Sequence, residues 1–327
     1  MAPLKDKIEN VLNETRILVL GIQILIGFGY RGFFEPGFEK MAPVAREVQL
    51  VALALMLFGL GVLLVPAPYH RIVLHGRNTA ELHRLATATV TTGLFPFAVS
   101  MALSFFLGAH WVLPTKSAAI MSGMMLGLTL ICWYGVELIA RRRKHGQLHA
   151  HALFDPLWEI DMQQEQETDL TTRVKQVLIE CRVVLPGAQA LLGFQLIIMW
   201  MTAFYKIPQL WKVLHLASLA CVGICTVLLI TPAAYHRIVE QGEDSEMLHH
   251  ITARLLLWAM VFLGLGTCGD FYLVARMTGL GNPLSLALAL AMLAFFFGSW
   301  FGYTFWKKRQ VHDKRLTESH LKEQSVA

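Results

Sequence analysis

Eight apolar runs, each about as long as a lipid bilayer is thick, determine what this chain can fold into. Crossing the ~30 Å hydrocarbon layer takes roughly 20 apolar residues at ~1.5 Å per residue. Runs of this kind, bounded by charged residues or proline, lie at 16–34, 48–65, 85–108, 119–140, 183–205, 214–231, 251–275 and 284–306. Because a segment in lipid must satisfy its backbone hydrogen bonds internally, the runs predict membrane-spanning helices.

Composition agrees with this prediction and excludes several other classes. Of the 327 residues, 55% are hydrophobic and 16% are charged, which is too apolar for an ordinary soluble domain or a disordered chain. The five cysteines lie in or beside apolar runs, without the paired spacing of a zinc site or a disulfide framework. We therefore expect reduced, buried thiols.

The net charge of +5 is explained by topology. Most of the 28 Lys and Arg residues fall on the side of the membrane that holds the N-terminus, including the basic clusters at 141–144 and 307–309. By the positive-inside rule, both termini are predicted to be cytoplasmic. The expected partner of these basic residues is anionic membrane lipid, and not nucleic acid.

The chain also contains an internal duplication. Residues from about 11 to 105 match those 166 positions later without a gap, and with one extra residue Trp133 matches Trp300. The matching polar residues are Glu14, Arg16, Gln23, Tyr69, His70, Arg71 and His83 in the first copy, and Glu180, Arg182, Gln189, Tyr235, His236, Arg237 and His249 in the second.

Each half contains four apolar runs, so both halves cross the membrane in the same direction. The predicted fold is an all-α polytopic membrane helical bundle, with eight transmembrane helices as two parallel four-helix repeats. We expect a fused pseudo-dimer with a pseudo-two-fold axis along the membrane normal. The predicted boundaries are 1–144 for the first repeat, 145–172 for a cytoplasmic linker, 173–310 for the second repeat and 311–327 for a cytoplasmic polar tail.

The repeated polar residues are predicted to form one layer at the cytoplasmic face. Glu14 and Arg16 begin the first run, the segment 66–71 follows the second run, and His83 precedes the third. On a helix, Arg16 and Gln23 share one face while Glu14 lies on the opposite one. The first helix is therefore expected to pack between two neighbours.

This polar layer has two interpretations. Histidines close to Glu14 can exchange protons near neutral pH, which suits a proton relay or a pH sensor. Alternatively, Glu14 pairs with Arg16, Arg71 or their copies, while His70 and His83 satisfy helix ends and only fix the geometry. The residues alone favour this structural role.

Haem binding is a further alternative. His70 and His83 lie on consecutive helices, and His236 and His249 repeat the arrangement, so two haems with paired histidine ligands are conceivable. No cysteine attachment motif supports them, and we predict no cofactor. The histidines between 145 and 151 have the spacing of a weak metal site, but in a linker we expect them to be solvated, and we predict no metal.

One acidic residue falls outside the repeated set. Asp270 lies toward the outer end of the seventh run. It can belong to an ion path, but we favour a position at the outer headgroups, where a carboxylate costs little.

At these repeated residues the sequence resembles a family of small bacterial membrane proteins of unknown function, which have about four helices and are sometimes labelled sodium:proton antiporters in genome annotation. Each half resembles one complete member. The resemblance implies a bacterial inner membrane protein, but it supplies no catalytic residues. Antiporters commonly hold carboxylates near the bilayer midplane, and here no acidic residue is repeated at that depth, which weakens the expectation of cation exchange.

Our first hypothesis is a transporter or channel for protons or a small ion, gated at the cytoplasmic face by the repeated Glu, Arg and His residues. The second is a non-transporting membrane scaffold or stress-accessory protein whose polar cluster only locks helices together. A haem-binding redox protein is the third. Nucleophile-elbow, Walker and dinucleotide-binding motifs are not evident, so we do not expect an enzyme.

Overall fold

The computed structural model describes residues 4–77, 79–110, 112–135, 170–238 and 245–310. Within these ranges the regular elements are all helices, and no strand occurs. Most of the predicted linker and the whole predicted tail lie outside the described residues. The last three positions of the predicted linker, 170–172, instead begin a long helix.

The first repeat contains three long helices, one shorter spanning helix and short connecting helices. Its elements are α1 (Leu4–Gly32), α2 (Pro36–Glu39), α3 (Pro43–Leu63), α4 (Pro66–Ile72), α5 (Ala80–His110) and α6 (Thr115–Leu130), which continues as the π-helical turn η1 (Ile131–Gly135). The second run and the Pro-x-x-Tyr-His-Arg segment thus form α3 and α4, separated by a short break at Leu64 and Val65.

The second repeat follows the same order. Its elements are α8 (Leu170–Ile198), α9 (Thr202–Lys206), α10 (Gln209–Ile238), α11 (Glu246–Met277), α12 (Asn282–Phe297) and the π-helical turn η3 (Gly298–Gly302). Here α10 is continuous across Pro232, where the first repeat is broken. The first repeat has a second proline, Pro68, at the position of Ala234, and each proline removes one helical hydrogen-bond donor.

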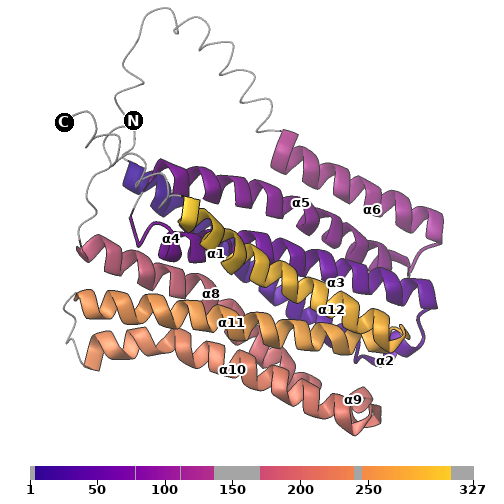
Figure 1. Cartoon of the computed structure of the whole chain (residues 1–327). Coiled ribbons are helices and arrows are strands. Elements are labelled where there is room, and N and C mark those ends of the chain that lie inside the picture. Colours follow the sequence, from indigo (N-terminus) through magenta and orange to yellow (C-terminus); the bar gives the residue numbers. More distant parts are fainter. Residues whose placement is uncertain (1–3, 78, 111, 136–169, 239–244, 311–327) are drawn as a thin grey trace, which may run out of the picture.

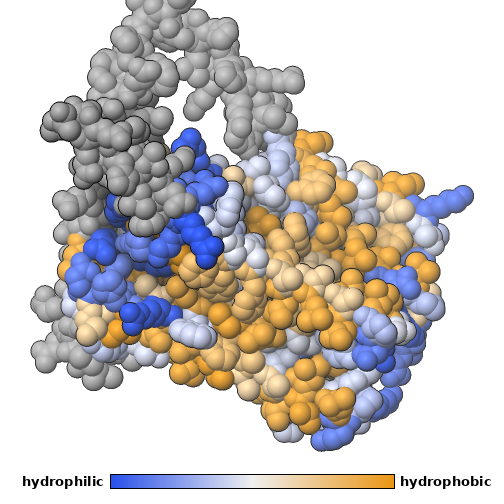
Figure 2. Space-filling view, in the orientation of Figure 1, coloured by the Kyte–Doolittle hydropathy of each residue, from blue (hydrophilic) through white to orange (hydrophobic). Residues whose placement is uncertain are grey.

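Eight helices are long and apolar enough to cross a membrane, which confirms the eight predicted spans. They are Val11–Gly32, Pro43–Ile72, Ala80–His110, Thr115–Tyr134, Thr172–Ile198, Gln209–Ala233, Glu246–Met277 and Asn282–Gln310. Figure 2 shows a broad apolar band between two hydrophilic ends of the bundle. The chain is therefore a multi-pass membrane protein.

The two repeats run in the same direction, as the even number of spans predicts. In Figure 1, α1, α5, α8 and α11 all start at the same end of the bundle, and α3, α10 and α12 return toward it. We call this end the basic end, because Arg71, Arg173 and the run Lys307–Arg309 lie there.

The repeats are joined along α1 and α8, and again where α12 packs on α3. Glycines make both approaches possible. A Cβ atom on Gly27 of α1 would overlap the ring of Phe194, and one on Gly61 of α3 would overlap the rings of Phe295 and Phe296. The indole nitrogen of Trp300 donates a hydrogen bond of 2.8 Å to the Gly61 carbonyl. Close backbone contact at small residues is how helices associate in lipid.

Candidate functional site: two buried ionisable clusters

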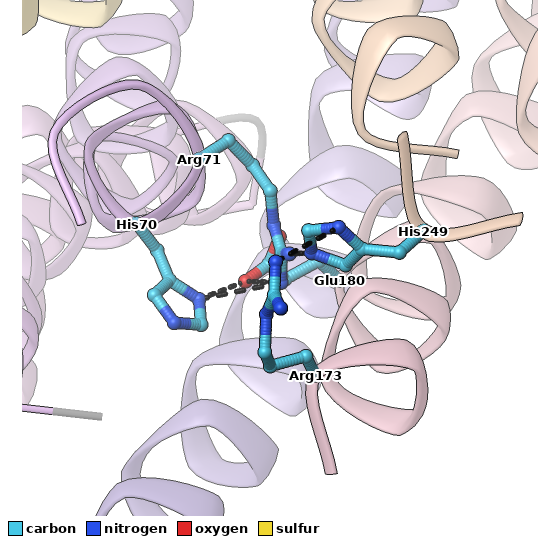
Figure 3. A network of polar contacts seen from close by, with 5 residues as sticks. All are labelled: His70, Arg71, Arg173, Glu180 and His249. Carbon is cyan, nitrogen blue, oxygen red and sulfur yellow. Dashed lines mark hydrogen bonds and ion pairs between the residues drawn. The ribbon is translucent and has the colours of Figure 1, made fainter. Parts of the chain in front are cut away.

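The first cluster lies between the repeats at the basic end. Arg71, on α4, donates from Nε to Oε2 of Glu180 at 2.5 Å and from Nη2 to Oε1 at 2.8 Å. Nδ1 of His70 lies 2.5 Å from the same Oε1 and donates to it, because an ionised carboxylate only accepts. Glu180 comes from α8 of the other repeat, so the cluster ties the two halves together (Figure 3).

Two residues of the second repeat complete this cluster. Nε2 of His249, on α11, lies 3.1 Å from Nη1 of Arg71. Arg173, on α8, approaches Nδ1 of His249 at 3.5 Å and donates to Glu246 at 2.9 Å. Figure 3 shows Arg71 reaching from the first repeat into the space between Glu180 and His249. We call His70, Arg71, Arg173, Glu180 and His249 the basic-end cluster.

Three residues of the cluster are almost completely removed from solvent. The side chains of His70, Arg71 and Glu180 are 0%, 1% and 2% exposed. Buried charges are tolerated when they are paired and hydrogen-bonded, and the two-pronged Arg71–Glu180 contact meets that requirement. Nε2 of His70 and Nε of Arg173 are buried and have no hydrogen-bond partner among the described residues, so two polar atoms of the cluster can still accept or donate a hydrogen bond.

A tight turn after α4 closes the cluster from one side. His75 and Gly76 both have positive φ, 51° and 82°, and the Gly76 N–H donates to the His70 carbonyl at 3.0 Å. A Cβ atom on Gly76 would lie 3.0 Å from Nε2 of His249 and 3.2 Å from Nη1 of Arg71. Glycine at this position therefore serves both the left-handed backbone and the close approach to the cluster.

The structure assembles only part of the predicted layer. His70, Arg71, Glu180 and His249 meet, whereas Glu14 and Arg16 of the first copy are exposed. Glu14 makes no hydrogen bond or ion pair within the described part of the chain, so the prediction that it pairs with Arg16 or Arg71 is wrong. The reason is geometric, because α1 turns its Gln23 face, and not its Glu14 face, toward α8.

The remaining predicted site residues lie apart from this cluster. Tyr69 is fully buried and stacks on Tyr303 with ring centroids 6.1 Å apart. Arg182 and Gln189 are exposed, while His83, Tyr235 and His236 are partly buried. The side chain of Arg237 lies outside the described part of the structure.

Gln23 occupies a notch at the centre of the repeat interface. Its side chain fills the space above Gly187 of α8, where an added Cβ atom would overlap it. Gln23 is 0% exposed, and neither Nε2 nor Oε1 has a hydrogen-bond partner among the described residues. A buried amide without partners is costly in a membrane protein, which marks this position as unusual.

A second cluster lies toward the opposite end of the bundle, and we call it the far cluster. Asp270 of α11 accepts a hydrogen bond from Nε2 of Gln195 at 2.6 Å, and Nδ1 of His215 lies 2.9 Å from its other oxygen. Nε2 of His215 approaches the Gln195 carbonyl at 3.0 Å. His215 and Asp270 are 0% and 2% exposed, so the prediction that Asp270 sits at the headgroups is wrong.

Aromatic residues of both repeats surround the far cluster. The rings of Phe34 and Phe204 lie 6.4 Å and 5.3 Å from that of His215. Tyr30 of α1 donates a 2.6 Å hydrogen bond to the Thr267 carbonyl, one turn before Asp270 on α11. These contacts exclude solvent and bring the first repeat to this cluster as well.

The repeat comparison does not detect the far cluster. Gln195, His215 and Asp270 correspond to Gly29, Gln49 and Ser104, so none of the three is repeated. The sequence feature that could have indicated this cluster is the presence of an acid and a histidine inside two consecutive apolar runs.

One group near the basic-end cluster has the arrangement of a metal site. Single ligand atoms of Glu246, His249 and His250 lie within 4.8 Å of one another. Arg173 already pairs with Glu246, and the guanidinium groups of Arg71 and Arg173 both face His249, so the surroundings are positively charged. The histidines between 145 and 151, the other metal candidate, lie outside the described residues.

Comparison with known proteins gives one match. Residues 4–137 and 163–304 each match the sequence model of DUF6328, described as a family of unknown function. The two segments correspond to the two repeats and together cover most of the chain. No curated protein and no solved structure matches the chain.

Proposed function

We propose that this chain, which belongs to the DUF6328 family, moves protons across the membrane along the interface between its two repeats, alone or coupled to a small ion. The observation that carries the proposal is the pair of buried ionisable clusters on the same two helices, α8 and α11, one toward each end of the bundle. Ionisable groups inside membrane spans are rare and commonly mark proton or ion pathways.

The two clusters are separated by a membrane-scale distance. Along α8, Glu180 and Gln195 are roughly 22 Å apart at ~1.5 Å per residue. A proton cannot cover this distance in one step, so transfer needs intermediate polar groups or water.

Gln23 supplies a polar group between the clusters. It contacts α8 at Gly187, about midway between Glu180 and Gln195, and its buried amide has no hydrogen-bond partner in the described part of the chain. Thr252, one turn after His249 on α11, has a buried hydroxyl that also lacks a hydrogen-bond partner among the described residues. Each of these groups can hold a water molecule that enters the interface, which would extend the polar chain.

The interface is closed in this conformation. Between the clusters, α11 places fully buried apolar side chains toward its neighbours, among them Leu256, Met260 and Leu263. Proton transfer therefore requires a small separation of the repeats that admits water, and the Arg71–Glu180 ion pair at the basic end would limit that opening.

Proton flux into liposomes tests the proposal. The purified protein is reconstituted with a pH-sensitive dye inside, and a potassium diffusion potential drives protons inward. Intact protein should acidify the vesicles, and Asp270→Asn and Glu180→Gln should each reduce the rate at least tenfold. Glu47→Gln, which changes an exposed glutamate outside both clusters, is the matched control and should retain the rate.

A structural role is the second candidate, because the two-hydrogen-bond ion pair between Arg71 and Glu180 can hold α4 and α8 together. Under this alternative, the same substitutions lower the unfolding temperature while the intact protein shows no flux. A haem-binding redox role makes a separate prediction, namely a Soret band in the absorption spectrum of the purified protein. Flux that depends on Asp270 distinguishes the proton pathway from both.

The proposed orientation places the basic end in the cytoplasm of a bacterial cell, against the anionic inner leaflet of the inner membrane. A membrane-impermeant thiol reagent applied to intact cells tests it. A single reactive cysteine at Lys116, on the opposite side, should be labelled, and one at Lys308 should be protected.

A further inference from the structure

The contacts between the two repeats are not reciprocal. Gln23 of α1 sits on Gly187 of α8, and Phe194 of α8 sits on Gly27 of α1. In a two-fold pair the copies of these contacts would also form, with Gln189 on Gly21 and Phe28 on Gly193. Instead, an added Cβ atom on Gly21 or Gly193 meets nothing within 4 Å. Apart from the contact between Phe28 and its own copy Phe194, the repeats are therefore joined head to tail and not about the predicted two-fold axis. Each repeat retains one largely unused face.

In the first repeat, residues on the facing sides of α1 and the α3–α4 segment are buried. Thr15, Leu63, Leu64 and His70 are 4%, 1%, 1% and 0% exposed. His70 meets its partner from the second repeat there, since it donates a hydrogen bond to the carboxylate of Glu180. The first repeat thus shows these positions buried, with Glu180 of the other repeat against His70.

The corresponding groove of the second repeat is open. A cavity of about 300 Å³ lies between α8 and α10, lined among others by Cys181, Arg182, Leu229, Pro232 and His236. These residues are the copies of Thr15, Arg16, Leu63, Pro66 and His70. Ile230 is 42% exposed there, whereas its copy Leu64 is 1% exposed. Four of these five residues are identical to their copies, and no described side chain fills the cavity.

The residue of the first repeat that corresponds to Glu180 does not contact the second repeat in this way. Glu14 is the copy of Glu180, yet it is exposed, whereas Glu180 is 2% exposed. On the same side of α1, Phe28 is 52% exposed. The Glu14 side of α1 thus remains largely exposed, although the ring of Phe28 also contacts that of Phe194, with centroids 4.5 Å apart. The open groove carries Arg182 and His236.

The outer helices also make a contact in one repeat that their copies do not make in the other. Helix α12 packs on α3, but their copies α6 and α10 lie at opposite edges of the bundle (Figure 1). Ile120 and Met124 on α6 are 64% and 69% exposed, and Val213 and Val227 on α10 are 53% and 64% exposed. Two chains side by side would let α6 of one copy meet α10 of the other.

We propose that a second copy of this chain docks the Glu14 face of its α1 into the open groove between α8 and α10, so that Glu14 lies against His236 and reproduces the His70–Glu180 contact between subunits. Each chain carries one such groove and one such face. A dimer that uses both is the smallest closed assembly. The proposal is independent of proton transfer.

Measuring particle mass in lipid nanodiscs or mild detergent tests the assembly. Native mass spectrometry should detect two chains per particle for the intact protein. Glu14→Lys places a like charge beside Arg182 and should weaken association at least tenfold, while Glu47→Lys, an equal charge change elsewhere, should not. Adding His236→Glu to Glu14→Lys should restore the dimer. A monomer under all conditions, or a dimer insensitive to Glu14→Lys, would overturn the proposal.

Crosslinking between differently tagged chains tests the contact itself. One chain carries Glu14→Cys and the other carries His236→Cys, both with Cys132→Ser to remove the exposed native thiol. A short bis-maleimide should join the two tags in membranes. Replacing Glu14→Cys by Glu47→Cys is the matched control and should give no product. Equal yields for both pairs, or none for either, would refute docking at this groove.

Discussion

At the residue scale, Arg71 is the centre of the basic-end cluster, because it alone contacts both Glu180 and His249 from the other repeat. Arg71→Ala would leave the Glu180 carboxylate buried without its strongest partner. Breaking a buried ion pair in this way costs roughly 3–5 kcal/mol. We therefore expect a clearly lower unfolding temperature by scanning fluorimetry. Arg16→Ala, at an exposed arginine, should stay within about 0.5 kcal/mol of the original, and an equal loss for both would contradict this assignment.

Gly76 makes a prediction of the same kind. Its φ of 82° is unfavourable for other L-residues, and an added methyl group would approach His249 and Arg71. We expect Gly76→Ala to destabilise the protein by about 1–3 kcal/mol. Gly108→Ala on α5, where an added Cβ atom meets nothing within 4 Å, should be neutral or slightly stabilising in the same melting experiment.

At the scale of elements, α1 and α8 are sequence copies that use opposite faces. Gly187 of α8 receives Gln23, but its copy Gly21 contacts nothing. Gly187→Ala should therefore push the helices apart and cost roughly 1–3 kcal/mol. Gly21→Ala should leave the melting temperature of the separated chains unchanged or raise it slightly.

The two glycine variants also separate stability from assembly. If Gly21 lies in a contact between chains, Gly21→Ala weakens dimerisation without lowering the stability of a single chain. Matched losses of stability in both variants would indicate a symmetric interface, contrary to the head-to-tail contacts described above.

At the scale of the whole molecule, the sequence was sufficient for the architecture. The bilayer thickness fixes how long an apolar run must be, so the sequence predicted eight spanning helices. An even number of spans per repeat means that the two repeats cross the membrane in the same direction. The same reasoning identified His70, Arg71, Glu180 and His249 as neighbours at one depth, because helix ends set depth.

Sequence reasoning failed where the two repeats differ in their surroundings. Corresponding residues such as Glu14 and Glu180 differ in burial, because packing places only Glu180 at the interface between the repeats. Aligning the two repeats cannot show which face of a helix packs against the corresponding helix of the other repeat. Self-comparison also cannot pair unrepeated residues, so Asp270 was singled out but its contacts with Gln195 and His215 were not predicted.

Gln23 gives the most direct test of the proposed proton pathway, since it lies between the clusters and takes part in no ion pair. Gln23→Leu keeps the volume of the side chain approximately and removes only its polar atoms. Proton flux into liposomes should fall at least tenfold, while the unfolding temperature stays equal or rises. Unchanged flux in a folded Gln23→Leu protein would contradict a pathway through the repeat interface.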